Sequence, residues 1–190
     1  ISRARELTVQ FVNSTYSAEQ RAVAAEEIRA LFGHGIALLN TQVDGRFIFG
    51  GNLDATPPFD AAGNYLGDTA VRQVEVAPGV LQDASVRADI VAKGVGGGAD
   101  VLTALQDLAT ALETNDQVGI QNALDPLDTA IRQIANGRSR LGASMAVLDS
   151  AGIAARTARD AERQAASHES DADAIESASK LALAQRALDA

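Results

Sequence analysis

The sequence contains no cysteine and no tryptophan, and its aromatic side chains are limited to five phenylalanines and two tyrosines. Without cysteine, the chain can form no disulfide bond and can carry out no thiolate chemistry. A lack of cysteine suits a protein that is exported unfolded through a channel. Because many cytosolic proteins also lack it, this absence alone does not indicate a compartment.

Basic residues are also in short supply. The chain has 16 Lys and Arg against 25 Asp and Glu, which gives a net charge of −9. This charge argues against nucleic acid or an anionic membrane surface as a partner. No run reaches the roughly 18 apolar residues of a membrane span, and no basic-then-apolar leader is present. Because the helical pattern already runs at Ile1 and still runs at Ala190, we expect a fragment of a longer protein.

Residues that could carry catalysis or bind a metal are sparse. His34 and His168 lie far apart in the sequence, and neither has a metal-ligand partner at helical spacing. Asp171 and Asp173 lack the ligand loop that a calcium site requires. No nucleophile motif surrounds any serine. We therefore predict a protein that is not an enzyme and that has no catalytic residues, metal site or cofactor.

The glycine-rich run from Gly94 to Gly98 leaves one alternative open, a nucleotide-binding module. The run lacks the Lys-Ser/Thr pair with which P-loops bind phosphate and magnesium, and it lacks the full dinucleotide-binding spacing. We therefore interpret it as a flexible loop.

Two helices are predicted at the beginning of the chain. Apolar residues at three- and four-residue steps predict a helix over residues 1–13 and a second one over residues 18–43. Ser17, followed three residues later by Gln20, forms a capping box at the start of the second helix. We expect the two helices to fold back or bend against each other.

The next part of the chain has the pattern of a small sheet and a further helix. Turn residues and short alternating runs over residues 63–90 predict a strand at residues 71–76 and one or two more at residues 80–81 and 86–90. Such short strands need helices packed on one face. A helix is then predicted over residues 100–114.

The longest periodic signal begins at Leu127. Its apolar positions fall at alternating four- and three-residue steps, which is the pattern of a coiled coil. We expect Leu148 to lie in a core between helices from both ends of the chain. The seam consists of Leu127, Ile131, Ile134, Leu141, Met145, Leu148, Gly152 and Ala155.

These patterns predict a mainly α fold with a small β region. Burial of the helical stripes favours a discontinuous helical bundle domain, formed by residues 1–44 together with residues 139–190. Residues 45–138 would then form a central α+β insertion with short strands and helices.

The chain changes character between residues 40 and 60, where helix gives way to turns and short extended runs. Asp44-Gly45 is a turn signal because Gly accepts positive φ angles. Of Phe47 and Phe49, we expect one to be largely buried and the other less so. We predict that this stretch organises the packing of the chain, because five of the seven aromatic residues fall in or beside it.

The residues of this stretch resemble the signature of the flagellar hook-associated protein 3 family, which belongs to the flagellin superfamily. The family's run has the form N-T-x-x-D-G-R-[FY]-[IL]-F-x-G and is followed by a T-x-P-F-type loop. The matching residues are Asn40, Thr41, Asp44, Gly45, Arg46, Phe47, Phe49, Gly51, Pro58 and Phe59.

Further stretches resemble the family in the same order along the chain. Gly67, Asp68 and Arg72 match its G-D-x-x-x-R strand segment, and residues 100–108 resemble its next helix. Residues 169–175 resemble an E-D-A-D-Y motif, although Ser170 and Ala174 stand in place of an acidic and an aromatic residue. The resemblance implies a flagellin-like fold, in which both chain ends form a long antiparallel helical bundle or coiled coil.

The first helix resembles a segment of the R-x-R-E-L-x-V-Q type, which lies on a subunit contact surface in flagellins. The subunit-contact candidates that follow from this resemblance are Arg3, Arg5, Glu6, Leu7, Val9 and Gln10.

The resemblance implies a structural, secreted protein of the bacterial flagellum that connects the hook-associated zone to the flagellin filament and serves motility. It implies a ring of copies in the full-length protein, flagellin and another hook-associated protein as neighbours, and an export chaperone. The location would be extracellular, after passage through the flagellar secretion channel. The alternative is a flagellin filament subunit. Because the terminal stripes are thin and the net charge is −9, we expect this fragment alone to be a monomer at micromolar concentration.

Overall fold

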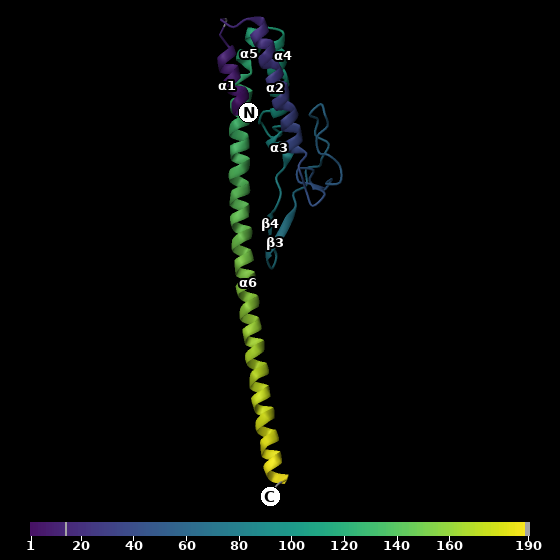
Figure 1. Ribbon diagram of the computed structural model, residues 1–190, viewed down its shortest axis with the longest axis vertical. Coiled ribbons are helices and arrows are strands. Elements are labelled where there is room, and N and C mark those ends of the chain that lie inside the picture. The colour runs from purple at the N-terminus through teal and green to yellow at the C-terminus, as the bar shows by residue number, and fades with distance from the viewer. Residues whose placement is uncertain (14, 189–190) are drawn as a thin grey trace. The chain divides into compact units, whose positions relative to one another are not determined.

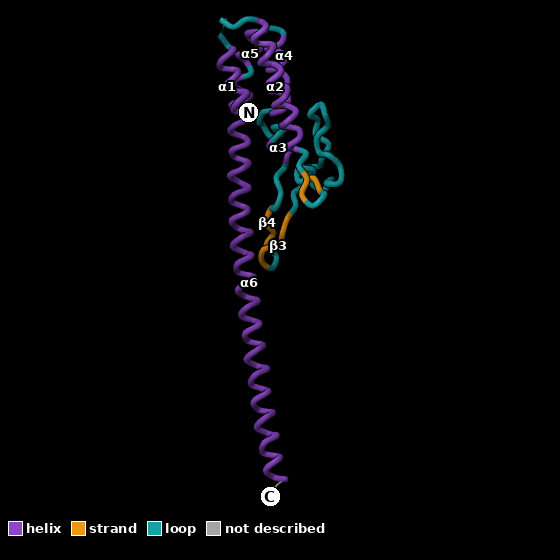
Figure 2. Tube along the Cα trace, in the orientation of Figure 1, coloured by secondary structure: helices purple, strands orange, loops and turns teal. Residues whose placement is uncertain are grey.

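The computed structural model describes residues 1–13 and 15–188. The chain divides into two compact units, Ile1–Met145 and Ala146–Ala190. Its fold is mainly α with a small β region, as predicted (Figure 1, Figure 2). The helices are α1 Ser2–Phe11, α2 Ala18–Leu39, α3 Ala88–Val91, α4 Val101–Glu113, α5 Gln117–Asn122 and α6 Leu124–Leu188. The strands are β1 Gln42–Val43, β2 Arg46–Phe47, β3 Gln73–Ala77 and β4 Val80–Asp83.

The start of α2 is fixed by the predicted capping box. The Ser17 hydroxyl accepts the N–H of Gln20 at 3.3 Å, and the Gln20 side chain accepts the N–H of Ser17 at 3.0 Å. The helix ends at Leu39 rather than at residue 43, so the predicted end lies too far along the chain. Residues 42–43 pair with β2 instead, because the turn that follows closes a hairpin.

Asp100 caps the start of α4 by accepting the N–H groups of Leu102 and Thr103, each at 3.1 Å. Such a cap satisfies backbone donors that have no partner within the helix. The structure places α4 within one residue of the predicted range at each end.

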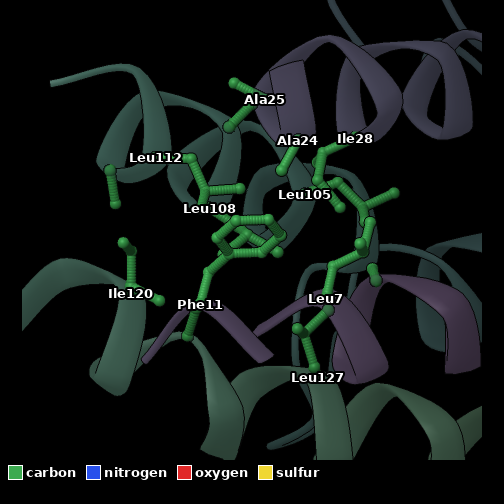
Figure 3. Packing of buried hydrophobic residues seen from close by; sticks show 14 of the residues in the cluster. Leu7, Phe11, Ala24, Ala25, Ile28, Leu105, Leu108, Leu112, Ile120 and Leu127 are labelled. Carbon is green, nitrogen blue, oxygen red and sulfur yellow. The ribbon is translucent and has the colours of Figure 1, made fainter. Parts of the chain in front are cut away.

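The core of the first unit joins α1, α2, α4, α5 and the first turns of α6 (Figure 3). Within this core, α4 packs extensively on α2. Both sides of the predicted boundary near residue 44 therefore contribute to one core, and the division into a bundle domain and an insertion stays a prediction. The largest buried side chains of this core include Leu7, Phe11, Ile28, Leu105, Leu108, Leu112, Ile120 and Leu127.

A buried arginine connects two turns at one end of this core. Arg21 is 3% exposed, and its guanidinium donates to the carbonyl of Asn13 at 2.9 Å and to the side chain of Asn115. Asn115 has a φ of 57°, a left-handed conformation that asparagine tolerates better than most residues. The connection between α1 and α2 is therefore fastened to the connection between α4 and α5.

The heptad seam of α6 is buried only where it begins. Leu127 is 0% exposed, whereas Met145 is 56% exposed and Leu148 is half-buried. The prediction that Leu148 lies in a core is wrong. A heptad pattern gives a helix an apolar stripe, but it does not supply the partner helix. Within residues 1–13 and 15–145, no element covers the stripe at Met145.

Two antiparallel two-stranded sheets make up the β region. In the second sheet, β3 and β4 pair Gln73 with Asp83, and Gly79 turns the chain between them with a φ of 76°. The predicted strands at residues 71–76 and 80–81 correspond to β3 and β4. Residues 86–90, predicted as a possible strand, lead instead into α3. In the described part of the chain, no helix has both the length and the apolar character needed to cross a membrane.

Replacing Leu108 with alanine tests the core. Leu108 is 0% exposed, so Leu108→Ala should lower the unfolding free energy by about 2–5 kcal/mol, through lost burial and a residual cavity. Leu38 on α2 is 56% exposed, and Leu38→Ala should change it by less than about 1 kcal/mol. Urea unfolding followed by circular dichroism measures both, and similar midpoints for the two variants would contradict this core.

Candidate functional site

The signature residues of the sequence lie together in one block of loops and short strands after α2. We call residues 40–72 the signature block. It contains the β1–β2 hairpin and the irregular chain that follows it (Figure 2). Its geometry shows which physical task each signature residue performs.

Asn40 joins the end of α2 to the middle of the block. Its side-chain N–H donates to the carbonyl of Phe59 at 2.8 Å, and its side-chain oxygen accepts the N–H of Phe59 at 2.9 Å. The Thr41 hydroxyl donates to the carbonyl of Leu38 at 2.7 Å. The Asn40 amide thus pairs with both backbone groups of one residue, which fixes the register of the returning chain.

Phe59 forms the small core of the block. It is 1% exposed and packs against α2, α3 and α4 residues, and the preceding Pro58 is also buried. Its ring centroid lies 5.1 Å from that of Tyr65, with a tilted arrangement typical of aromatic pairs.

The β1–β2 hairpin turns at Asp44 and Gly45, whose φ angles are 51° and 76°. Two consecutive positive φ angles are typical of the tight hairpin turn that the Asp-Gly pair predicts. Phe47 is 7% exposed and Phe49 is half-buried, which confirms the predicted difference. The difference arises because β2 ends at Phe47; alternate residues of a continuing strand would share one face.

The Asp68 carboxylate occupies space that only a glycine at position 51 leaves open. One Asp68 carboxylate oxygen accepts the N–H groups of Asn52 at 3.0 Å and Ala70 at 2.9 Å. A Cβ atom at Gly51 would lie 1.9 Å from that oxygen, and Gly51 also has a φ of 68°. Only glycine fits this position without displacing the carboxylate.

Arg72 closes the block from its far end. Its guanidinium donates to the Asp54 carboxylate at 2.6 Å and to the carbonyl of Gly51 at 3.1 Å. Arg46 approaches the same carboxylate at 3.4 Å, and the carbonyl of Asp54 accepts the N–H of Phe47 at 2.9 Å. Sequence reasoning missed Asp54, although it lies between the two predicted arginines and is an acidic residue that could pair with them.

Gly67 leaves room for Tyr65. A Cβ at Gly67 would lie 2.5 Å from the Tyr65 hydroxyl, which itself lies 2.7 Å from the carbonyl of Asp68. Burial raises the pKa of the Tyr65 phenol, and the Asp89 carboxylate raises it further. The phenol therefore stays protonated and remains a hydrogen-bond donor near neutral pH.

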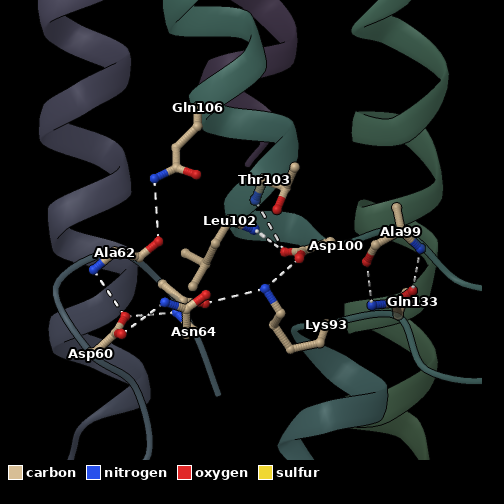
Figure 4. Close-up of polar contacts among 11 residues, drawn as sticks. Asp60, Ala62, Asn64, Lys93, Ala99, Asp100, Leu102, Thr103, Gln106 and Gln133 are labelled. Atoms are coloured by element: carbon tan, nitrogen blue, oxygen red, sulfur yellow. Dashed lines mark hydrogen bonds and ion pairs between the residues drawn. The ribbon is translucent and has the colours of Figure 1, made fainter. Parts of the chain in front are cut away.

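The side chains of Lys93, Gln106 and Gln133 bind the signature block and the glycine loop to the helices (Figure 4). Lys93 donates to the carbonyl of Gly63 at 3.2 Å and forms an ion pair with Asp100. Gln106 of α4 donates to the carbonyl of Ala62 at 3.3 Å. The signature block is therefore held against α4 as well as against α2.

Gln133 of α6 pins the loop that contains residues 94–98. Its side-chain N–H groups lie 2.8 Å from the carbonyl of Val91 and 3.0 Å from that of Ala99, and its oxygen accepts the N–H of Ala99 at 3.0 Å. Gly98 leaves the space for this contact, because a Cβ there would lie 1.8 Å from the Gln133 oxygen. No sequence signal indicated Gln133, since its partners are distant in the chain.

The subunit-contact candidates are divided between surface and core. Arg3, Arg5, Glu6, Val9 and Gln10 are exposed, whereas Leu7 is 3% exposed and belongs to the core. Leu7 is therefore not available to a second subunit in this fold. The use of the five exposed residues by a neighbouring subunit stays a prediction.

The exposed arginines of α1 already have partners within the chain. Arg3 donates to Glu27 at 2.6 Å, and Arg5 pairs with Asp128 of α6. Hydrogen bonds and charge from these carboxylates raise the pKa of both guanidinium groups. Such exposed pairs contribute little stability but fix the orientation of the side chains.

Nothing in the described residues forms a cluster of three or more His, Asp or Glu side chains that could hold a metal ion. The geometry of the signature block is that of a folding element, because the side chains of Asn40, Asp68 and Arg72 bond to backbone groups or to another side chain of the block.

Replacing Gly51 with alanine tests the tight contact with Asp68. Gly51→Ala should lower the unfolding free energy by about 2–4 kcal/mol, because the left-handed backbone becomes strained and the Asp68 hydrogen bonds must shift. Gly45 has a similar φ of 76° but open space around it, so Gly45→Ala should cost only about 1–2 kcal/mol. Equal losses in denaturant unfolding would show that the contact with Asp68 is unimportant.

The pH dependence of stability tests the Asp100–Lys93 pair. Burial alone would raise the pKa of Asp100, but hydrogen bonds from Lys93 and Thr103 outweigh it and lower the pKa. Because the folded-state pKa lies below the unfolded value, the stabilisation is complete above about pH 4 and is lost as the pH falls through the folded-state pKa. The acid limb is the fall of the unfolding free energy as the pH decreases. Asp100→Asn and Lys93→Met should each flatten this limb, and the double variant should flatten it no further than Asp100→Asn does. An unchanged limb in both single variants would contradict the pair.

We compared the sequence and the structure with those of known proteins. The sequence matches no protein-family model and no curated protein. The structure is similar to that of FlgL from Xanthomonas campestris, with a TM-score of 0.75 and 19% identity over 87% of this chain and 88% of that chain. FlgL from Bacillus cereus gives a TM-score of 0.70 and 22% identity over 84% of this chain and 77% of that chain. The flagellar hook-associated protein 3 from Legionella pneumophila gives 0.70 and 17%, over 84% of each chain.

The likeness covers most of this chain and most of each solved structure. The chain therefore has the fold of the flagellar hook-associated protein 3 structures.

Proposed function

We propose that the chain is a structural component of the bacterial flagellum that connects the hook-associated zone to the flagellin filament. The observation that carries this proposal is the fold shared with FlgL structures over most of both chains. The signature block supports it independently, because residues matched by motif, from Asn40 to Arg72, form one hydrogen-bonded assembly.

The role that we infer is mechanical. Copies of the full-length protein would form a ring, with flagellin on one side and another hook-associated protein on the other. The protein would reach this extracellular position through the flagellar secretion channel, with the help of an export chaperone. A chain without cysteine can pass such a channel with no disulfide to break and reform.

A flagellin filament subunit is the alternative within the same class. The Asp44-Gly45 hairpin and the buried Pro58-Phe59 pair favour the junction protein, because these residues match the signature that we associate with the hook-associated protein 3 family.

A nucleotide-binding module at the glycine run has less support. Two backbone N–H groups of this loop already bond within the chain, that of Val95 to Asp89 at 3.0 Å and that of Gly98 to Gly94 at 2.9 Å. A phosphate site would need such groups to be free and convergent. We therefore infer a structural protein rather than an enzyme.

Deleting the gene distinguishes the two flagellar functions. Without a junction protein, hooks should form normally and flagellin should appear unpolymerised in the culture medium. Electron microscopy of the cells and immunoblots of the medium measure these outcomes, and expression of the full-length gene from a plasmid is the control. Loss of the main filament antigen itself would assign the chain to flagellin instead.

A further inference from the structure

A groove of about 500 Å³ lies in the first unit, between α6 and the chain that follows β4. Its lining includes the apolar side chains of Val86 and Ile90. Its α6 wall includes Arg132, Arg140 and Ser144. The groove is therefore lined by both apolar and basic side chains, and we call it the basic groove.

The arginines of the groove lie in a basic stretch of an otherwise acidic chain. Residues 129–148 contain three arginines and neither Asp nor Glu, although the net charge of the chain is −9. Arg132 and Arg140 are exposed, and among the described residues neither forms an ion pair; Arg132 donates only to the Thr129 hydroxyl at 3.2 Å. These two guanidinium groups are available to a partner.

Two further charged residues line the groove. Arg87, which also lines it, pairs with the buried carboxylate of Asp89. Asp83 lines it as well, and its carboxylate accepts a hydrogen bond from Gln73 at 2.8 Å. The Asp83 carboxylate keeps its negative charge, so the two unpaired arginines of α6 outweigh it and the net charge of the groove is positive.

A segment with the complementary character lies further along the same sequence. Residues 169–176 of α6 carry four carboxylates, and no Lys or Arg occurs between Arg163 and Lys180. Glu176 pairs with Lys180 at 2.6 Å, which leaves three carboxylates without an ion pair in the part of the chain that the structure describes.

We propose that the basic groove binds the acidic segment, residues 169–176, of a second copy of this chain. The carboxylates of Glu169 and Asp173, one helical turn apart on one face of α6, would meet Arg132 and Arg140. The inference rests on the proposed function, because a ring of copies brings identical chains side by side. Exposed ion pairs are individually weak and are screened by salt. The isolated chain is therefore a monomer at micromolar concentration and associates only when concentrated.

Disulfide cross-linking tests this contact cleanly, because the chain has no native cysteine. A Ser144→Cys chain is mixed with a Ser170→Cys chain under mild oxidation at low salt. The control pair replaces Ser144→Cys with Ser139→Cys, since Ser139 is exposed on α6 but does not line the groove. Mixed dimers should form about tenfold faster than in the control pair, because two weak ion pairs together contribute a gain of about this size. This excess rate over the control should vanish near 1 M salt, where the ion pairs are screened.

Charge reversal tests the assignment of the ion pairs. Adding Arg132→Glu and Arg140→Glu to the Ser144→Cys chain should remove the excess, and adding Glu169→Lys and Asp173→Lys to its partner should restore it. Circular dichroism confirms that each variant folds. Cross-linking at the control rate, or a rate that charge reversal leaves unchanged, would overturn the proposal.

One further measurement separates a second copy from another flagellar partner. Additional copies of the wild-type chain should protect the Ser144→Cys thiol from alkylation. Protection by purified flagellin but not by this chain would overturn the assignment to a second copy. The deletion phenotype does not depend on which groove joins the copies, so either proposal can fail while the other holds.

Discussion

The packing of α4 on α2 is the contact on which the first unit depends. Ala24 and Ala25 of α2 are nearly or fully buried, and their small side chains allow the leucine stripe of α4 to approach the helix closely. Leu108 and Leu112 of that stripe are 0% exposed. The α1 helix, α5 and the first turns of α6 add their apolar faces to this pair. The other α4 face carries Leu102, which lies in the core of the signature block.

The signature block has a different kind of stability. Its apolar core is small, centred on Phe59, so its shape depends on saturated polar groups and on positions that only glycine can occupy. Asn40 connects the helical core to the signature block, because it ends α2 and also pairs with the backbone of Phe59. A block of this kind can keep a defined surface without a large core, which suits a protein whose proposed task is to fit between two different neighbours.

The sequence predicted the features that arise from local chemistry. The capping box at Ser17, the hairpin turn at Asp44-Gly45 and the extent of α4 were all predictable, because the residues that determine them are close in the chain. The signature motif located the residues of the block but not the bonds among them. Gln133 could not be predicted, because it bonds to residues more than thirty positions away. Leu148 was misplaced because periodicity describes one helix and says nothing about whether a partner covers it.

The bonds that close the signature block span short stretches of chain. Asn40 and Phe59 are 19 residues apart, Phe49 and Tyr65 are 16 apart, and Gly51 and Arg72 are 21 apart. The Arg5–Asp128 pair, by contrast, joins residues 123 positions apart. Short loops cost less entropy to close and close faster than long ones. The signature block should therefore form early during folding, and the long-range helical contacts should assemble afterwards.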